Sequence, residues 1–131
     1  WSTSKNVEEA LVNLTDLSPS QRKNRIAELM EQTGLSKSLL DTPVRKLSGG
    51  EQRRLALLRS LSISPEFLIL DEVTAGLDLI STEAVLQLLE KYEQEHDCAY
   101  LVITHDIQVA SRLCEVICEI EHGKFTKKAV R

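Results

Sequence analysis

Long apolar runs, an excess of basic residues and paired cysteines are all missing from this sequence of 131 residues. Its strongly apolar runs, such as residues 67–70, are far shorter than the ~20 residues that a membrane-spanning helix needs. The 16 basic and 20 acidic residues give a net charge of −4, which argues against a nucleic-acid surface. We therefore expect neither direct membrane insertion nor a nucleic-acid partner.

The cysteines Cys98, Cys114 and Cys118 make an odd set without a C-x-x-C pair, which is typical of a reduced, cytosolic chain. Cys114 and Cys118 are four positions apart and could share one face of a helix. No histidine pair accompanies them, so core packing is favoured over a metal site.

At the amino-terminal end, apolar residues recur at helical spacing. This pattern predicts a helix over residues 4–14 and a second that begins at Pro19, after a capping Ser18, and stops at Gly34. Leucines 35, 39 and 40 form a short apolar turn before Pro43. On composition alone this part is a helical hairpin with no chemistry of its own.

Residues 47–62 predict a helix whose N-terminus suits an anion. Ser48 is the expected N-cap of a helix that opens on Gly49 and Gly50, so backbone N–H groups are free to face a negative charge. Leucines 55, 58 and 61 should face inward until Pro65 ends the helix.

Two strands carry polar residues at their carboxyl ends. Residues 67–70 are apolar without alternation, as in a parallel strand buried on both faces, and end in Asp71 and Glu72. Adjacent carboxylates at such an edge suit magnesium and water chemistry. A second buried strand, residues 100–103, delivers Thr104 and His105.

The remaining elements complete a strand–helix–strand order that predicts a parallel α/β core. A turn with Gly76 and Asp78 leads into a helix to about residue 95, residues 106–113 form another helix, and a terminal hairpin turns at His122-Gly123. We expect a helical part over residues 1–62 and an α/β part over residues 63–131.

Four motifs in this order resemble the ATP-binding cassette (ABC) ATPases. Residues 47–51 (LSGGE) resemble the family's signature motif, residues 67–72 (FLILDE) its Walker B strand with the catalytic glutamate, residues 75–78 (AGLD) its D-loop, and residues 104–106 (THD) its switch histidine. The resemblance covers most of the chain. It implies the cofactors ATP and Mg²⁺.

The resemblance also implies roles for individual residues. Asp71 would hold Mg²⁺ through water, Glu72 would act as general base, and His105 would contact the γ-phosphate and the attacking water. The residues implied to bind ATP are Ser48, Gly49, Gly50, Glu51 and Asp78, the signature motif acting in trans on the nucleotide of a second domain.

The other histidines and a cluster of arginines are expected to have structural or surface roles. His96 and His122 are expected to be structural. The cluster of Arg53, Arg54 and Arg59 is expected to be solvated or paired with acids.

One motif of the family is missing from the 131 residues. No G-x-x-x-x-G-K-[ST] phosphate loop occurs, and the one Gly-Lys pair is Gly123-Lys124. No convincing Q-loop precedes the signature motif. The expected fold is therefore a partial P-loop NTPase domain, with a helical subdomain before a parallel sheet and without the phosphate-loop portion.

Departures from the family pattern refine the functional hypothesis. Glu51 replaces the more frequent glutamine, and Val73 the proline usual after the catalytic glutamate. The run from Asp71 to Tyr92 resembles the branch that imports peptides and nickel. The resemblance implies an importer ATPase that pairs with a second nucleotide-binding domain and with membrane permease subunits, at the inner face of the cell membrane.

Three alternatives remain open. A cassette ATPase of DNA repair or chromosome structure would carry long coiled coils, and no extended heptad run occurs. The translation-factor branch usually has an Asn-His pair where Ala75-Gly76 stands. The chain could also act alone as a non-catalytic binding or assembly module.

Overall fold

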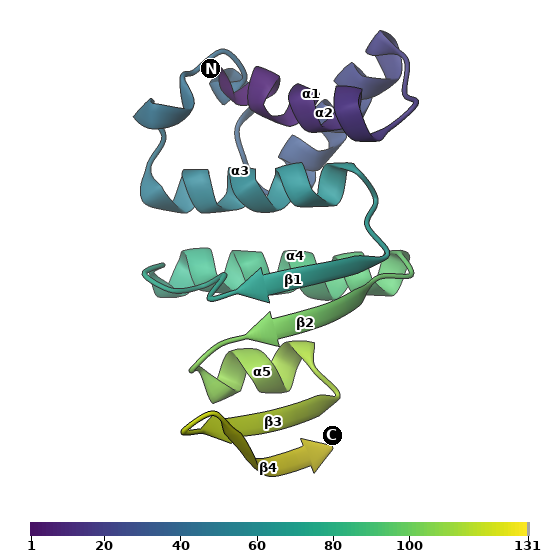
Figure 1. Cartoon of the computed structure of the whole chain (residues 1–131). Helices are drawn as coiled ribbons and strands as arrows, with labels where there is room; N and C mark the ends of the chain where they lie inside the picture. The colour runs from purple at the N-terminus through teal and green to yellow at the C-terminus, as the bar shows by residue number, and fades with distance from the viewer. Residues whose placement is uncertain (131) are drawn as a thin grey trace.

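The computed structural model describes residues 1–130, which form a helical layer followed by an α/β layer (Figure 1). The helical layer contains α1 (Thr3–Leu14), α2 (Pro19–Gln32), the short 3-10 turns η1 (Lys37–Leu39) and η2 (Val44–Lys46), and α3 (Gly49–Ser62). The α/β layer contains β1 (Phe67–Asp71), α4 (Leu79–Glu95), β2 (Ala99–Ile103), α5 (Ile107–Leu113), β3 (Val116–Glu121) and β4 (Lys124–Val130).

Local capping sets the helix boundaries, as the sequence predicts. The Ser18 hydroxyl accepts from the backbone N–H of Gln21, whose side chain accepts in turn from the Ser18 N–H, so a capping box opens α2. The chain leaves α2 through Gly34, whose φ of +65° lies in the left-handed region that favours glycine. The predicted start and stop of this helix are confirmed.

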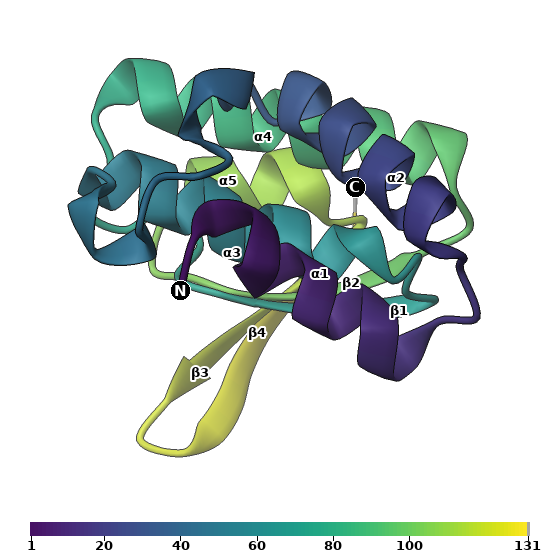
Figure 2. The ribbon, with the colours of Figure 1, turned by 90° about the horizontal axis from the view of Figure 1, so that it is seen from above.

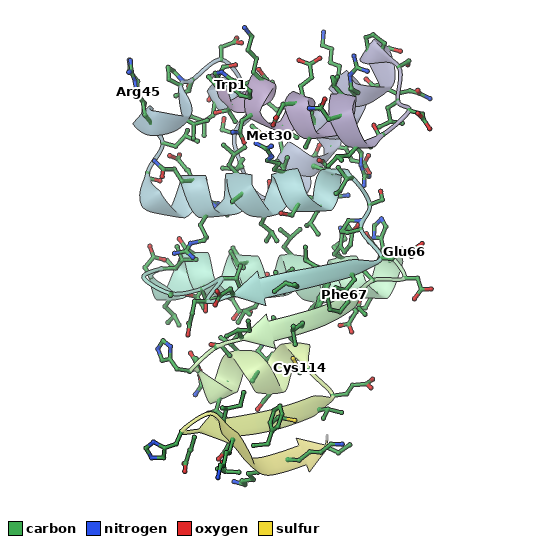
Figure 3. The ribbon with its side chains drawn as sticks, in the orientation of Figure 1. Trp1, Met30, Arg45, Glu66, Phe67 and Cys114 are labelled. Atoms are coloured by element: carbon green, nitrogen blue, oxygen red, sulfur yellow. The ribbon has the colours of Figure 1, made fainter. Side chains whose placement is uncertain are left out.

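The helical layer is held together across α1, α2 and α3. Val7 and Leu11 of α1, Met30 of α2 and Leu58 of α3 are all fully buried, and Met30 lies between the helices in Figure 3. At the rim, Arg59 of α3 forms an ion pair with Glu9 of α1.

Two separate strand pairs make up the sheet structure. β1 and β2 are parallel, with Asp71 opposite Ile103, and are joined through α4. β3 and β4 form the predicted antiparallel hairpin, with the turn at His122-Gly123 and an irregular register between Glu119 and Ile120.

The prediction that the strands are buried on both faces is wrong. Leu68 and Leu70 are buried, whereas Phe67 is 57% and Ile69 59% exposed. α4 and α5 lie on one side of the β1–β2 pair (Figure 2), and the opposite face, which carries Phe67 (Figure 3), is largely exposed. On β2, Leu101 and Ile103 are also exposed.

The predicted shared helix face of Cys114 and Cys118 is also wrong, because Cys114 follows the last residue of α5 and Cys118 lies in β3. A single buried cluster joins residues of the helical and α/β layers. The division at residues 62 and 63 therefore stays a prediction about organisation. None of the helices in the described part of the chain is long and apolar enough to cross a membrane.

Candidate functional site

The carboxyl edge of β1 and β2 brings together residues that the sequence places far apart. The register aligns Asp71 with Ile103, and the backbone N–H of Glu72 donates to the carbonyl of Ile103 at 2.9 Å. This bond fixes Glu72 beside the chain that continues into Thr104 and His105. We call Asp71, Glu72 and His105 the sheet-edge group.

Glu72 and His105 make direct contact. The imidazole Nδ1 lies 2.8 Å from Oε1 of Glu72, and the carboxylate accepts this hydrogen bond. The hydrogen bond and the negative charge of Glu72 raise the pKa of His105 above its ordinary value. The histidine side chain is 83% exposed and that of Glu72 35%, so this pair is open to a ligand arriving from solvent.

Glu72 has a backbone conformation that is unusual for a residue with a side chain. Its φ is +48°, in the left-handed region. The carbonyl of Glu72 accepts from the N–H of Ala75 at 3.0 Å, which closes a turn directly after β1. We call residues 72–75 the Glu72 turn. Strained backbone of this kind clusters at functional sites, although it does not itself identify one.

Asp71 ends β1 with its side chain exposed. Among residues 1–130 there is no group of three or more histidine, cysteine, aspartate or glutamate side chains that could hold a metal ion alone. Mg²⁺ is usually bound through one or two carboxylates together with substrate phosphates and water. A single exposed carboxylate at a strand end is compatible with that mode of binding.

The signature motif begins α3 with a capping box. The Ser48 hydroxyl accepts from the N–H of Glu51 at 3.3 Å, and the carboxylate of Glu51 accepts from the N–H of Ser48 at 2.7 Å. The bond from the Ser48 backbone is the main cause that lowers the pKa of Glu51. Glu51 therefore caps the N-terminus of α3.

The two glycines of the signature motif differ in their surroundings. A Cβ atom added to Gly49 would meet nothing within 4 Å, so this position is open to an approaching molecule. A Cβ on Gly50 would lie 3.6 Å from Oγ of Ser81 and 3.9 Å from Cδ2 of Leu77. The signature motif thus lies beside the D-loop turn and the start of α4.

Asp78 has a structural role that is visible directly. Its carboxylate accepts from the backbone N–H of Ser81 at 2.7 Å and caps α4. Hydrogen bonds from Ser81 lower its pKa below the ordinary value. Two residues earlier, Gly76 has a φ of +74°, which a larger residue would adopt only with strain.

Comparisons with known proteins identify the family of this chain. The family model described as "ABC transporter" matches residues 2–75, more than half of the chain. The chain belongs to the ABC transporter family. The nickel import ATP-binding protein NikE of Escherichia coli K12 is 34% identical over 122 residues, which are 93% of this chain and 46% of that protein.

Solved ABC cassettes share the fold. The dimeric bacterial ABC transporter cassette MJ0796 matches with a TM-score of 0.86 and 30% identity over 99% of this chain and 56% of that one. The cbiO1 protein of Clostridium perfringens, part of the transporter complex cbiONQ, matches with a TM-score of 0.83 and 29% identity, over 98% of this chain and 51% of that chain. The predicted fold, an α/β partial cassette domain, is confirmed. The chain spans about half the length of the curated relatives it matches.

One residue of this ABC cassette was missed by the sequence analysis. Arg53 is half-buried and, within residues 1–130, forms no ion pair with an acid. Its Nη1 donates to the carbonyl of Glu72 at 3.1 Å and its Nη2 to that of Ala75 at 3.0 Å. Its neighbour Arg54 donates instead to the carbonyls of Gly34 and Gly50. No pattern in the sequence links position 53 to a turn that follows the next strand.

Proposed function

We propose that this chain is the later part of an ATP-binding and ATP-hydrolysing subunit of an ABC importer. The observation that carries the proposal is the contact of Glu72 with His105 beside Asp71, at the carboxyl edge of two parallel strands. Such an edge is where α/β proteins bind ligands and do their chemistry. The family supports an ATPase over the alternatives of a repair protein, a translation factor or a binding module.

In this proposal each member of the sheet-edge group has one task. Glu72 accepts a proton from the attacking water, because its carboxylate is 35% exposed and lies where a water can approach it. His105, held through Nδ1, has its other ring nitrogen available for a phosphate oxygen or the water. Asp71 supplies a carboxylate for Mg²⁺, which, when bound together with phosphate oxygens, stabilises the charge that develops on the transferred phosphoryl group.

The signature motif serves a different nucleotide. Gly49 is open to the outside, and the N-terminus of α3 favours an anion, so Ser48, Gly49 and Gly50 are proposed to bind the γ-phosphate held by a second nucleotide-binding domain. Glu51 and Asp78 support this surface by capping α3 and α4. A dimer of cassettes is the partner arrangement that this requires, and the solved neighbour MJ0796 is dimeric.

ATP hydrolysis in this proposal requires a phosphate loop from outside these 131 residues. Most of the binding of the β- and γ-phosphates in such ATPases comes from the N–H groups and lysine of that loop. The chain by itself is proposed to be inactive.

The transported substrate is proposed to be a peptide or a metal complex of the nickel type. The support is the 34% identity to the nickel import ATP-binding protein NikE. In this assignment the subunit docks on membrane permease subunits, and its place is peripheral, at the inner face of the cell membrane.

The test is phosphate release by this chain expressed together with the residues that precede it in its gene. Glu72→Gln should nearly abolish hydrolysis and leave ATP binding intact, since the amide keeps the shape of the carboxylate but cannot accept the proton. Normal turnover in this variant would remove Glu72 from the mechanism. A preceding segment without a phosphate loop would contradict the ATPase proposal as a whole.

A further inference from the structure

We propose that Arg53 is a positioning residue that joins the signature helix α3 to the Glu72 turn, and so couples the two nucleotide sites that one subunit serves. This inference rests on the proposed function, because the two sites exist only if the cassette dimerises around ATP. The observation behind it is a single guanidinium group that bridges two backbone carbonyls across the boundary between the layers.

The guanidinium holds the Glu72 turn at both of its ends. Nη1 donates to the carbonyl of Glu72 and Nη2 to that of Ala75, and the Glu72 carbonyl also accepts from the N–H of Ala75. A planar guanidinium presents its donors in a fixed geometry, so two simultaneous bonds restrict both the position and the orientation of the turn.

The turn needs such support because of its backbone. Glu72 has a φ of +48°, which is disfavoured for a residue with a Cβ atom and persists only when the surroundings determine it. On one side the turn is tied to β2 by the bond from the Glu72 N–H to Ile103. On the other side Arg53 ties it to α3. Together these bonds aim the Glu72 carboxylate at His105.

The same helix begins at the signature motif. Arg53 lies five residues after Ser48, within the second turn of α3. In the proposed dimer, the N-terminus of α3 contacts the ATP of the opposite subunit, whereas Glu72 acts on the ATP of its own subunit. A shift of α3 on contact with the opposite nucleotide would therefore pull on the Glu72 turn through Arg53.

The test is the titration of His105 by NMR in the 131-residue chain, which needs neither nucleotide nor turnover. Glu72 and, to a smaller extent, Asp106 hold the pKa of His105 above its ordinary value. In Arg53→Met the Glu72 turn should relax, and the hydrogen bond between Glu72 and His105 should be lost. The pKa of His105 should then fall toward that of free imidazole. The amide proton of Ala75 should also exchange faster with solvent.

The direction of the change separates positioning from charge. Removal of a nearby cation, by itself, makes a histidine easier to protonate and raises its pKa. A fall therefore indicates loss of the Glu72 contact, which is the main cause of the elevated pKa. Arg54→Met is the matched control: it removes the same charge one position along α3 without touching the Glu72 turn, and the pKa of His105 should not fall.

Arg53→Lys provides a second variant that keeps the charge. Its single ammonium group cannot reproduce the two-carbonyl bridge, so an intermediate fall is expected. Should Arg53→Met fail to give a folded spectrum, Arg53→Lys decides the question. A His105 pKa that is unchanged or raised in a folded Arg53 variant would overturn the inference.

In the nucleotide-hydrolysing parent, Arg53→Met should lower kcat by about tenfold or more and leave KM for ATP nearly unchanged, since misplacement of a catalytic group by ~1 Å can cost about 100-fold. An unchanged kcat would overturn the coupling part of the inference. A parent that does not hydrolyse ATP at all would overturn the proposed function instead, while the titration would still decide the positioning role.

Discussion

Replacing Ser48 by alanine should lower the free energy of unfolding by about 1 kcal/mol, the usual effect of removing an N-cap side chain. The structure locates the loss: the Ser48 hydroxyl accepts from the N–H of Glu51, and this N–H would be left without its capping partner. A loss of this size corresponds to roughly a fivefold change in the folding equilibrium constant.

Urea unfolding at pH 7 measures this effect. With a denaturant slope of about 1–3 kcal/mol per molar, the midpoint should move down by roughly 0.3–1 M. Ser60→Ala is the matched control, because Ser60 is an exposed serine of the same helix whose hydroxyl donates to the carbonyl of Ala56 and caps nothing. A Ser48→Ala variant as stable as Ser60→Ala would refute the capping argument.

The other half of the capping box depends on pH. Bonds from Ser48 lower the pKa of Glu51 in the folded state, so its contribution to stability is fully present above the unfolded value of about 4.5. This contribution is lost as the pH falls through the folded pKa. Glu51→Gln should therefore be less stable than the parent chain at pH 7, and the two stabilities should converge in strong acid.

Ser48→Asp separates capping from nucleotide binding. Aspartate caps a helix about as well as serine, so stability should change by only a few tenths of a kcal/mol. Its carboxylate would however repel the γ-phosphate that the signature motif is proposed to bind, and turnover in the intact ATPase should collapse. Full turnover with Ser48→Asp would refute the placement of phosphate at this helix terminus.

The remaining predictions concern the two sites and the uncovered sheet face. Glu72→Gln in the 131-residue chain should lower the pKa of His105, measured by NMR, because the main cause of its elevation is removed; an unchanged pKa would contradict the contact. A bulky residue at Gly49 should cut turnover of the intact ATPase without changing the nucleotide affinity of the monomer, since a Cβ there meets nothing and the motif serves the opposite ATP; equal losses would contradict the trans assignment. By calorimetry the 131-residue chain should show little specific affinity for Mg-ATP, and micromolar binding would contradict this. In light scattering the chain should self-associate through the face that exposes Phe67 and Ile69, which Ile69→Lys should suppress; a monomer insensitive to dilution would contradict it.

Local signals made much of the fold predictable. Ser18-Pro19 and Ser48 mark helix starts through bonds to residues three positions away, and both caps are observed. The sheet-edge group was predictable for a similar reason. Parallel strands end at one edge, so residues that follow β1 and β2 must be neighbours.

Non-local relations were not predictable. The apolar run of residues 67–70 predicts burial on both faces, but an apolar sequence does not say which partner covers each face, and Phe67 and Ile69 are exposed here. Cys114 and Cys118 fit helical spacing, yet the helix ends at Leu113 and the spacing spans a turn into β3. In both cases the sequence has the pattern, but the tertiary or secondary structure around it differs from the one that the pattern predicts.

Arg53 is the instructive case, because its chemistry depends on tertiary contact alone. The sequence places it in a basic run, where a solvated or acid-paired side chain is the ordinary outcome. In the structure Arg53 instead donates to the backbone of the Glu72 turn. Arg54, one position later on α3, points in a different direction and donates to the carbonyls of Gly34 and Gly50. The Glu72 turn carries a glutamate in a disfavoured backbone conformation. The position of the carboxylate therefore depends on α3, whose N-terminus is proposed to contact a different nucleotide. In the proposed dimer, hydrolysis at one nucleotide site and binding at the other would thereby be linked within a single chain.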